Sequence, residues 1–159
     1  MPEDSVREEL KNIIHSFSNN FGGPKFEPHV TLVSSFLGHE KGLLQKTEMI
    51  SKKIKPFKIF FDGILHLDEY FRTLFLKVKF SSQLQEARDI TGNELNWNDQ
   101  DYTPHLSLTY GKYGVREKEK MISTLDSLPD CFFVNKIFLA QNDEIRLKWN
   151  VIRGFKLGE

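Results

Sequence analysis

Two stretches of the sequence, F-E-P-H-V-T-L at residues 26–32 and Y-T-P-H-L-S-L at residues 102–108, match each other in register. In both, an aromatic residue is followed after one position by Pro-His, then by an apolar residue, a Thr or Ser, and a second apolar residue. Each stretch also follows a predicted helix. Because repetition within a chain is typical of duplicated architectures, the match predicts a repeated strand-and-helix unit with a pseudo-two-fold axis.

The elements around these stretches alternate between helices and strands. Apolar residues at helical spacing predict helices over residues 6–21, 40–54, 82–95 and 115–127, with the charged side of residues 116–120 turned to water. Runs rich in aromatic and branched residues predict strands at 28–33, 57–67, 71–80, 102–111, 131–141 and 145–157. The last two strands are expected to pair through a turn at Asn142-Asp143. Such hairpins favour antiparallel sheets, so the predicted class is α+β.

Composition restricts the kind of protein and of partner. The 159 residues suit one domain spanning 1–159, and 39% hydrophobic with 28% charged residues is typical of a soluble globular chain. Lys+Arg and Asp+Glu balance at 22 each, which favours a small ligand over long nucleic acid. The acidic N-terminus is unlike a signal peptide, and no apolar run approaches a membrane span. We expect a monomer in the cytosol, with the nucleus as the alternative.

Strand geometry gives the repeated stretches a chemical meaning. Side chains at positions i and i+2 share one face of a strand, so His29 is grouped with Thr31 and His105 with Ser107. If the two strands are neighbours, two imidazoles and two hydroxyls converge on one spot. Imidazole titrates near neutral pH, so one His can accept a proton while the other donates one. Hydroxyls can donate to phosphate oxygens, and this set therefore predicts phosphoryl transfer.

Other candidate residues lack a matching context. The remaining histidines, His15, His39 and His66, have no hydroxyl partner, and no closely spaced His or Cys ligands indicate a metal, so no cofactor is expected. Cys131, the single cysteine, lies in an apolar run and is expected to be a small buried hydrophobe. Trp97, in a polar loop, is the better candidate for an exposed aromatic contact.

At the motifs HVTL (29–32) and HLSL (105–108) the chain resembles the two-histidine (2H) phosphoesterases, and within them the plant and yeast cyclic phosphodiesterases. The likeness extends over nearly the whole chain. It implies a bilobal duplicated fold with an antiparallel sheet in each lobe, outer helices, and both motifs in the cleft between the lobes. It also implies that Tyr110 lines the site, which a regular strand would not allow unless it bends or ends near Gly111. The family usually starts with a further strand, of which MPED at residues 1–4 resembles only the end. Either that strand is absent, which would leave an open sheet edge in one lobe, or the given sequence starts late.

The resemblance implies metal-independent hydrolysis of a small cyclic phosphate. The substrates of that branch are ADP-ribose 1″,2″-cyclic phosphate, which arises from tRNA splicing, and nucleoside 2′,3′-cyclic phosphates, which open to 2′-phosphates. It favours His105 as base and His29 as acid, although the pseudo-symmetry leaves either assignment open. Two alternatives remain: an RNA-end-processing phosphodiesterase of the same fold, and a non-catalytic nucleotide-binding module.

Overall fold

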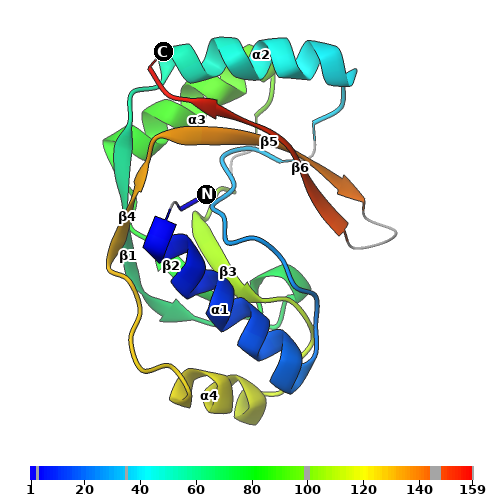
Figure 1. Ribbon diagram of the computed structural model, residues 1–159, viewed down its shortest axis with the longest axis vertical. Coiled ribbons are helices and arrows are strands. Elements are labelled where there is room, and N and C mark those ends of the chain that lie inside the picture. Colours follow the sequence, from blue (N-terminus) through cyan, green and yellow to red (C-terminus); the bar gives the residue numbers. More distant parts are fainter. Residues whose placement is uncertain (3, 35, 99–100, 144–147, 159) are drawn as a thin grey trace.

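A computed structural model of the chain describes residues 1–159 except 3, 35, 99–100, 144–147 and 159. Its helices are α1 (Asp4–Phe21), α2 (Glu40–Lys53), α3 (Ser82–Leu95), α4 (Val115–Ser123) and the short 3₁₀ helix η1 (Tyr70–Arg72). Its strands are β1 (Phe57–Leu65), β2 (Leu74–Val78), β3 (His105–Thr109), β4 (Cys131–Val134), β5 (Lys136–Asp143) and β6 (Lys148–Lys156). Figure 1 shows α2 and α3 at one end of the molecule and α4 at the other.

The three longer helices lie where the sequence predicts them, because their signals are local. The predicted inward stripe of α1 is confirmed, with Leu10, Ile14 and Phe17 between 0% and 2% exposed. This helix ends where Gly22 takes a left-handed φ of 85°, a conformation that glycine adopts without steric cost. The predicted cap of α3 is also present, since Ser81 Oγ accepts the Leu84 N–H at 3.2 Å.

The strands form two antiparallel sheets, which confirms the α+β class. One sheet has the order β3-β2-β1-β4, and the other pairs β5 with β6. The predicted continuous strand over 131–141 is wrong, because the chain changes sheets at Asn135. Phe132 and Val134 face the core from β4, which pairs with β1, while the Asn135 carbonyl accepts the Leu157 N–H at 2.8 Å at the end of the second sheet. Each half thus buries its apolar side chains against a different partner.

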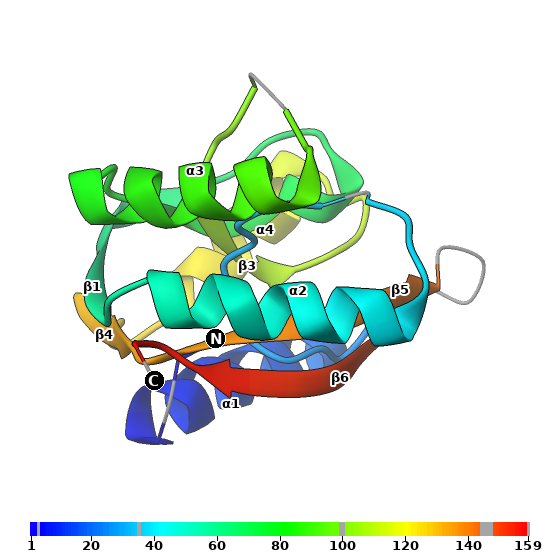
Figure 2. The ribbon, with the colours of Figure 1, turned by 90° about the horizontal axis from the view of Figure 1, so that it is seen from above.

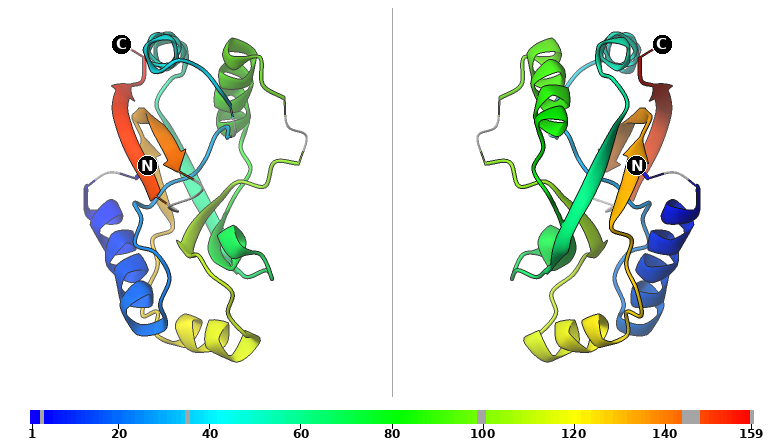
Figure 3. Two further views of the ribbon diagram at one scale, coloured as in Figure 1. Left: turned by 90° about the vertical axis from the view of Figure 1, so that its right-hand side faces the viewer. Right: turned by 90° about the vertical axis from the view of Figure 1, so that its left-hand side faces the viewer.

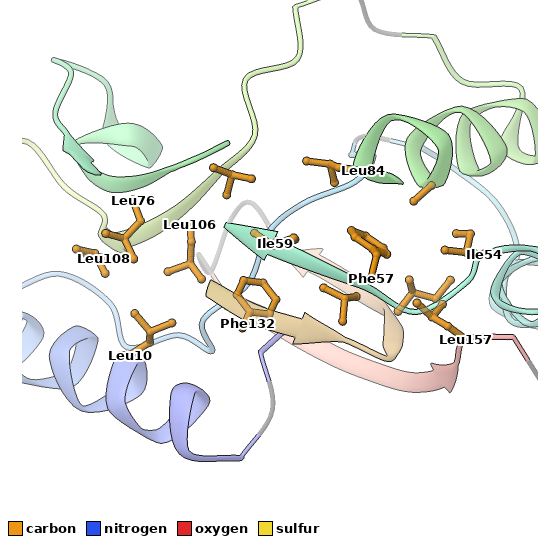
Figure 4. Packing of buried hydrophobic residues seen from close by; sticks show 14 of the residues in the cluster. Leu10, Ile54, Phe57, Ile59, Leu76, Leu84, Leu106, Leu108, Phe132 and Leu157 are labelled. Carbon is orange, nitrogen blue, oxygen red and sulfur yellow. The ribbon is translucent and has the colours of Figure 1, made fainter. Parts of the chain in front are cut away.

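The hydrophobic core runs through the molecule from α1 to α2. α1 packs on β3, whereas α2 packs on α3 and on the β5-β6 pair. In Figure 4, Leu10 lies near Leu106 and Leu108 at one end, Phe132 and Ile59 occupy the middle, and Ile54 and Leu157 close the other end. Figure 2 shows α2 and α3 side by side, and Figure 3 shows both far from α4. Within the described residues no helix combines the length and apolarity that crossing a bilayer requires.

Helix α4 is shorter than predicted, and one of its charged residues is buried. Lys118 lies within the stretch 116–120 that the sequence pattern turns to water, yet it is 1% exposed. Its ammonium donates to the Leu67 carbonyl at 2.8 Å and to Asp68 Oδ1 at 2.6 Å. The charge is tolerated inside because it is paired and hydrogen-bonded.

Candidate active site

His105 begins strand β3, and a backbone carbonyl fixes the orientation of its ring. Its Nδ1 lies 2.7 Å from the carbonyl oxygen of Thr103. A carbonyl oxygen only accepts, so Nδ1 carries the hydrogen and Nε2 is the nitrogen with the lone pair in the neutral ring. Pro104 stands between the two residues, and a residue before proline is held extended. The Thr-Pro-His sequence therefore helps to aim the carbonyl at the ring.

His29 makes the same contact with the same spacing. Its Nδ1 lies 2.7 Å from the carbonyl oxygen of Glu27, two residues earlier, with the buried Pro28 between them. The two imidazoles are thus placed in equivalent tautomers by equivalent backbone groups. The same local contact therefore recurs at both copies of the Pro-His pattern.

The backbone around the two histidines is not equivalent, and the strand predicted over 28–33 is wrong. Val30 makes one isolated antiparallel bridge, to Leu106 of β3, and the residues beside it adopt no regular strand. Pro28 contributes to this irregularity because it has no N–H to donate to a ladder. The bridge nevertheless places the two motifs side by side.

The register of the bridge groups the four polar residues. Within β3, His105 and Ser107 lie on the face opposite to Leu106, and a regular strand paired at Val30 would put His29 and Thr31 on that same face. Diagonal neighbours in such a pair are about 7–8 Å apart. The charge of His105 contributes to the lowered pKa of His29, which agrees with two neighbouring rings.

The two hydroxyls of the motifs are in different states. Thr31 is exposed, and its hydroxyl makes no hydrogen bond to the part of the chain that the structure describes. Ser107 is 4% exposed, and its hydroxyl donates to the Phe71 carbonyl at 2.8 Å. The Thr31 hydroxyl can therefore donate to a ligand directly, whereas the Ser107 hydroxyl must first break its hydrogen bond to the Phe71 carbonyl.

Tyr110 reaches the site because strand β3 ends before it. The strand stops at Thr109, and Gly111 takes a φ of 147°. The Tyr110 ring stacks on Phe26 with a centroid distance of 4.0 Å, and Phe26 in turn lies 6.2 Å from the His29 ring. Burial raises the pKa of Tyr110 to about 12, and a hydrogen bond with Ser107 only partly opposes that rise. The phenol is therefore a neutral hydrogen-bonding group at the edge of the site.

Burial lowers the pKa of both imidazoles. The pKa of His29 falls from 6.5 to about 4, chiefly because burial disfavours the charged ring; the bond to the Glu27 carbonyl raises it, and the charges of the Met1 amino group and of His105 lower it. Burial also lowers the pKa of His105, and its bond to the Thr103 carbonyl opposes that shift. Both rings are thus neutral at pH 7 in the free protein, and either can accept a proton.

The family follows from comparison with known proteins. Residues 1–157 match the profile of the family described as "Cyclic phosphodiesterase-like protein". The chain belongs to this family. It is 27% identical over 150 residues to the "Cyclic phosphodiesterase" of Arabidopsis thaliana, an alignment covering 90% of this chain and 82% of the plant protein. The predicted resemblance to the cyclic phosphodiesterases among the 2H phosphoesterases is confirmed, and the chain is an enzyme of this type.

Solved structures share the fold of this cyclic phosphodiesterase-like protein at low sequence identity. Escherichia coli LigT complexed with 3′-AMP aligns with a TM-score of 0.64 at 12% identity, covering 98% of this chain and 95% of LigT. LigT complexed with ATP aligns at 0.59 and 13%, covering 98% and 94%. The TT0787 protein of Thermus thermophilus aligns at 0.57 and 16%, covering 95% and 92%. These matches establish that the chain shares the fold of LigT.

One residue beside the site of this cyclic phosphodiesterase-like protein escaped the sequence analysis. Phe71, in η1, is 55% exposed and meets Tyr110 edge-on at 5.3 Å, while its carbonyl accepts the Ser107 hydroxyl. The sequence pattern placed Phe71 at the start of the strand predicted over 71–80, whereas β2 begins only at Leu74 and Phe71 lies in η1. An exposed aromatic ring next to the motif residues offers a surface on which a planar group can stack.

The other candidates do not join this site. Trp97 is half-buried, and the Arg88 guanidinium lies over its ring at 5.2 Å. A hollow of about 390 Å³ beside these two residues contains neither motif histidine, so its size does not make it the catalytic site. Cys131 is partly exposed rather than buried. Among the described residues, no group of three or more His, Cys, Asp or Glu is arranged to hold a metal.

Proposed function

We propose that this cyclic phosphodiesterase hydrolyses ADP-ribose 1″,2″-cyclic phosphate, nucleoside 2′,3′-cyclic phosphates, or both, with His29 and His105 as a metal-independent acid–base pair. One observation carries the proposal: the two imidazoles occupy adjacent segments, each with Nδ1 held 2.7 Å from the carbonyl oxygen two residues earlier. In such a pair, one ring can accept a proton from the attacking water on one side of the phosphate. The other ring can donate a proton to the leaving ribose oxygen on the opposite side.

The reaction moves one proton at each imidazole. The neutral ring takes a proton from water at Nε2 as the water oxygen bonds to phosphorus. The protonated ring gives its Nε2 proton to the ribose oxygen as the bond between that oxygen and phosphorus breaks. The product is a phosphomonoester with a free ribose hydroxyl. Each ring is worth about 100- to 10,000-fold in rate.

The bound phosphate supplies the charge that the acid needs. In the free protein burial keeps both imidazoles neutral, with the larger shift at His29. An anionic phosphate between the rings favours the imidazolium and restores one proton. Because burial lowers the pKa of His29 further than that of His105, His105 is favoured as acid and His29 as base, which is the reverse of the assignment implied by the family resemblance.

The surrounding groups suit a small nucleotide. Thr31 presents an unused hydroxyl to a non-bridging phosphate oxygen, and Tyr110 and Phe71 offer aromatic surface for a base or sugar. LigT, which shares the fold, has been solved with 3′-AMP and with ATP. A ligand of this class agrees with the balanced charge of the chain, which provides no field for long nucleic acid.

The test is turnover of ADP-ribose 1″,2″-cyclic phosphate and the four nucleoside 2′,3′-cyclic phosphates in EDTA, with product isomers resolved. We expect hydrolysis by the wild type and its near-complete loss in His29→Ala and His105→Ala. Hydrolysis abolished by EDTA, or retained in either variant, would refute the mechanism. Nucleotide binding without any product would identify a binding module instead.

A second substrate separates acid from base. A catechol cyclic phosphate with a nitro group has a leaving oxygen that departs without protonation. The variant lacking the acid should therefore still hydrolyse it, while the variant lacking the base should not. If His105→Ala retains this activity and His29→Ala does not, His29 is the base.

A further inference from the structure

The two motif histidines are supported in different ways. His105 belongs to β3, which is hydrogen-bonded to β2 with His105 opposite Lys77. His29 lies in a segment whose pairing to β3 is the single bridge at Val30. The Thr103 carbonyl that orients His105 is followed by Pro104, whose carbonyl accepts the Val78 N–H at 3.1 Å, so β2 holds the backbone beside it. The segment of His29 has the Val30 bridge and the Tyr102 hydroxyl, which donates to the Thr31 carbonyl at 2.9 Å, and both contacts lie beyond His29 rather than at Glu27.

Two cationic side chains hold Glu27 itself. Arg7 donates through Nε at 2.9 Å and through a terminal nitrogen at 2.7 Å to Glu27 Oε2, and Lys11 Nζ lies 3.1 Å from Glu27 Oε1. We call Arg7, Lys11 and Glu27 the charge clamp. Its side chains are 39%, 29% and 28% exposed; burial acts to raise the pKa of Glu27, but the two cations together outweigh it and hold that pKa below its ordinary value. The carboxylate therefore stays charged and paired at neutral pH.

The charge clamp joins the first motif to a rigid part of the fold. Arg7 and Lys11 are one helical turn apart on α1, and Leu10 between them is fully buried where α1 packs on β3. The chain after α1 runs back along this helix, so that Glu27 meets its first turns (Figure 1). Glu27, the acidic member of the charge clamp, also supplies the backbone carbonyl that accepts from His29 Nδ1. Its side chain and its backbone therefore connect α1 to the imidazole.

We propose that Glu27, gripped by Arg7 and Lys11, is a positioning residue that holds the His29 ring in its Nδ1–H tautomer and aimed at the phosphate. This inference rests on the proposed function of His29. Loss of the ion pairs on Glu27 leaves the His29 ring chemically intact, but the Glu27 carbonyl that orients the ring is then less firmly held. Because small misplacements of a reacting group are costly, we expect kcat to fall about tenfold.

The test compares Glu27→Gln with a matched control. Glu94→Gln removes the partner of Lys53 in an ion pair between α2 and α3 that touches neither motif. Two measurements are made on each protein: kcat and KM for the cyclic phosphate that the wild type hydrolyses fastest, and the tautomers of His29 and His105 by ¹⁵N NMR of the imidazoles.

The expected result is specific to one ring. Glu27→Gln should lower kcat about tenfold with KM within about twofold, because orientation and not binding is lost. The Nδ1–H tautomer of His29 should become less populated while that of His105 is unchanged, and the control should match the wild type. Arg7→Met, which leaves Lys11 in place, should give a smaller effect in the same direction. It also serves as the second variant if Glu27→Gln fails to fold.

Other results would overturn the proposal. If Glu27→Gln keeps both kcat and the His29 tautomer while the wild type is active, the clamp has no positioning role and the proposed hydrolysis stands. A change in both rings, or a loss of thermal stability beyond that of the control, would indicate general loosening and also exclude it. If the wild type hydrolyses nothing but the His29 tautomer shifts in the variant, the orienting role stands and the proposed hydrolysis is wrong.

Discussion

Acidification is expected to destabilise this fold through His29. The perturbation is a decrease in pH from 7 to about 4, applied to the wild type and to His29→Asn. Asn does not titrate, and its side-chain amide can donate to the Glu27 carbonyl from roughly the place of Nδ1. The difference between the two proteins therefore isolates the protonation of one imidazole from all other titrating groups.

The magnitude follows from the burial of the ring. In the fold the pKa of His29 is about 4, whereas the ordinary value is 6.5. Between these values the unfolded chain binds more protons than the folded one, so stability falls as the pH falls through this window. One pKa unit corresponds to about 1.4 kcal/mol, so the wild type should lose about 3 kcal/mol more than the variant by pH 4.

Urea unfolding followed by circular dichroism at several pH values measures this loss. We expect the difference in unfolding free energy between wild type and His29→Asn to be constant above pH 7 and to change steadily below the ordinary pKa. Curves that remain parallel down to pH 4 would show that the ring is not desolvated in the fold. Inorganic phosphate should reduce the pH dependence of the wild type, because a bound anion favours the imidazolium.

Three further variants test the site and the fold. Thr31→Val should lower kcat/KM more than Ser107→Ala, because the Thr31 hydroxyl has no hydrogen bond to any described residue, whereas the Ser107 hydroxyl donates to the Phe71 carbonyl; steady-state kinetics measures this, and equal losses would contradict it. Gly23→Ala should lower the thermal unfolding midpoint strongly, because φ is 91° and an added Cβ would lie 2.7 Å from the Tyr110 carbonyl oxygen. Ser81→Ala should cost about 1 kcal/mol in urea unfolding through loss of the α3 cap, and a neutral effect would show that the cap is not stabilising.

The helices and the motif histidines could be predicted from sequence because each depends on neighbours along the chain. Apolar spacing and a serine cap locate α3, and two glycines followed by a proline end α1. The contact between each imidazole and the carbonyl two residues earlier is equally local. A repeated Pro-His pattern therefore carried enough information to select His29 and His105.

The partner of each strand could not be predicted in this way. Residues 131–141 form one apolar run, but the chain divides it at Asn135 between two sheets, because β1 and β6 offer separate surfaces to bury. The first motif has a strand-like pattern but obtains only one bridge. The burial of Lys118 depends on Asp68, which is far away in sequence. Pairings of this kind are decided by packing in three dimensions and leave no periodic signal.

The sequence by itself determined which side chains can do chemistry at this site. Residue type decides where imidazoles, hydroxyls and charges occur, and the Pro-His spacing places a carbonyl two residues before each imidazole. Only the tertiary structure decided how the surroundings of the motif at 29–32 differ from those of the motif at 105–108. Ser107 is engaged by the Phe71 carbonyl, and Glu27 is gripped from α1. Those contacts join residues 16 or more positions apart, so they exist only once the helix, the turn and β3 are packed together.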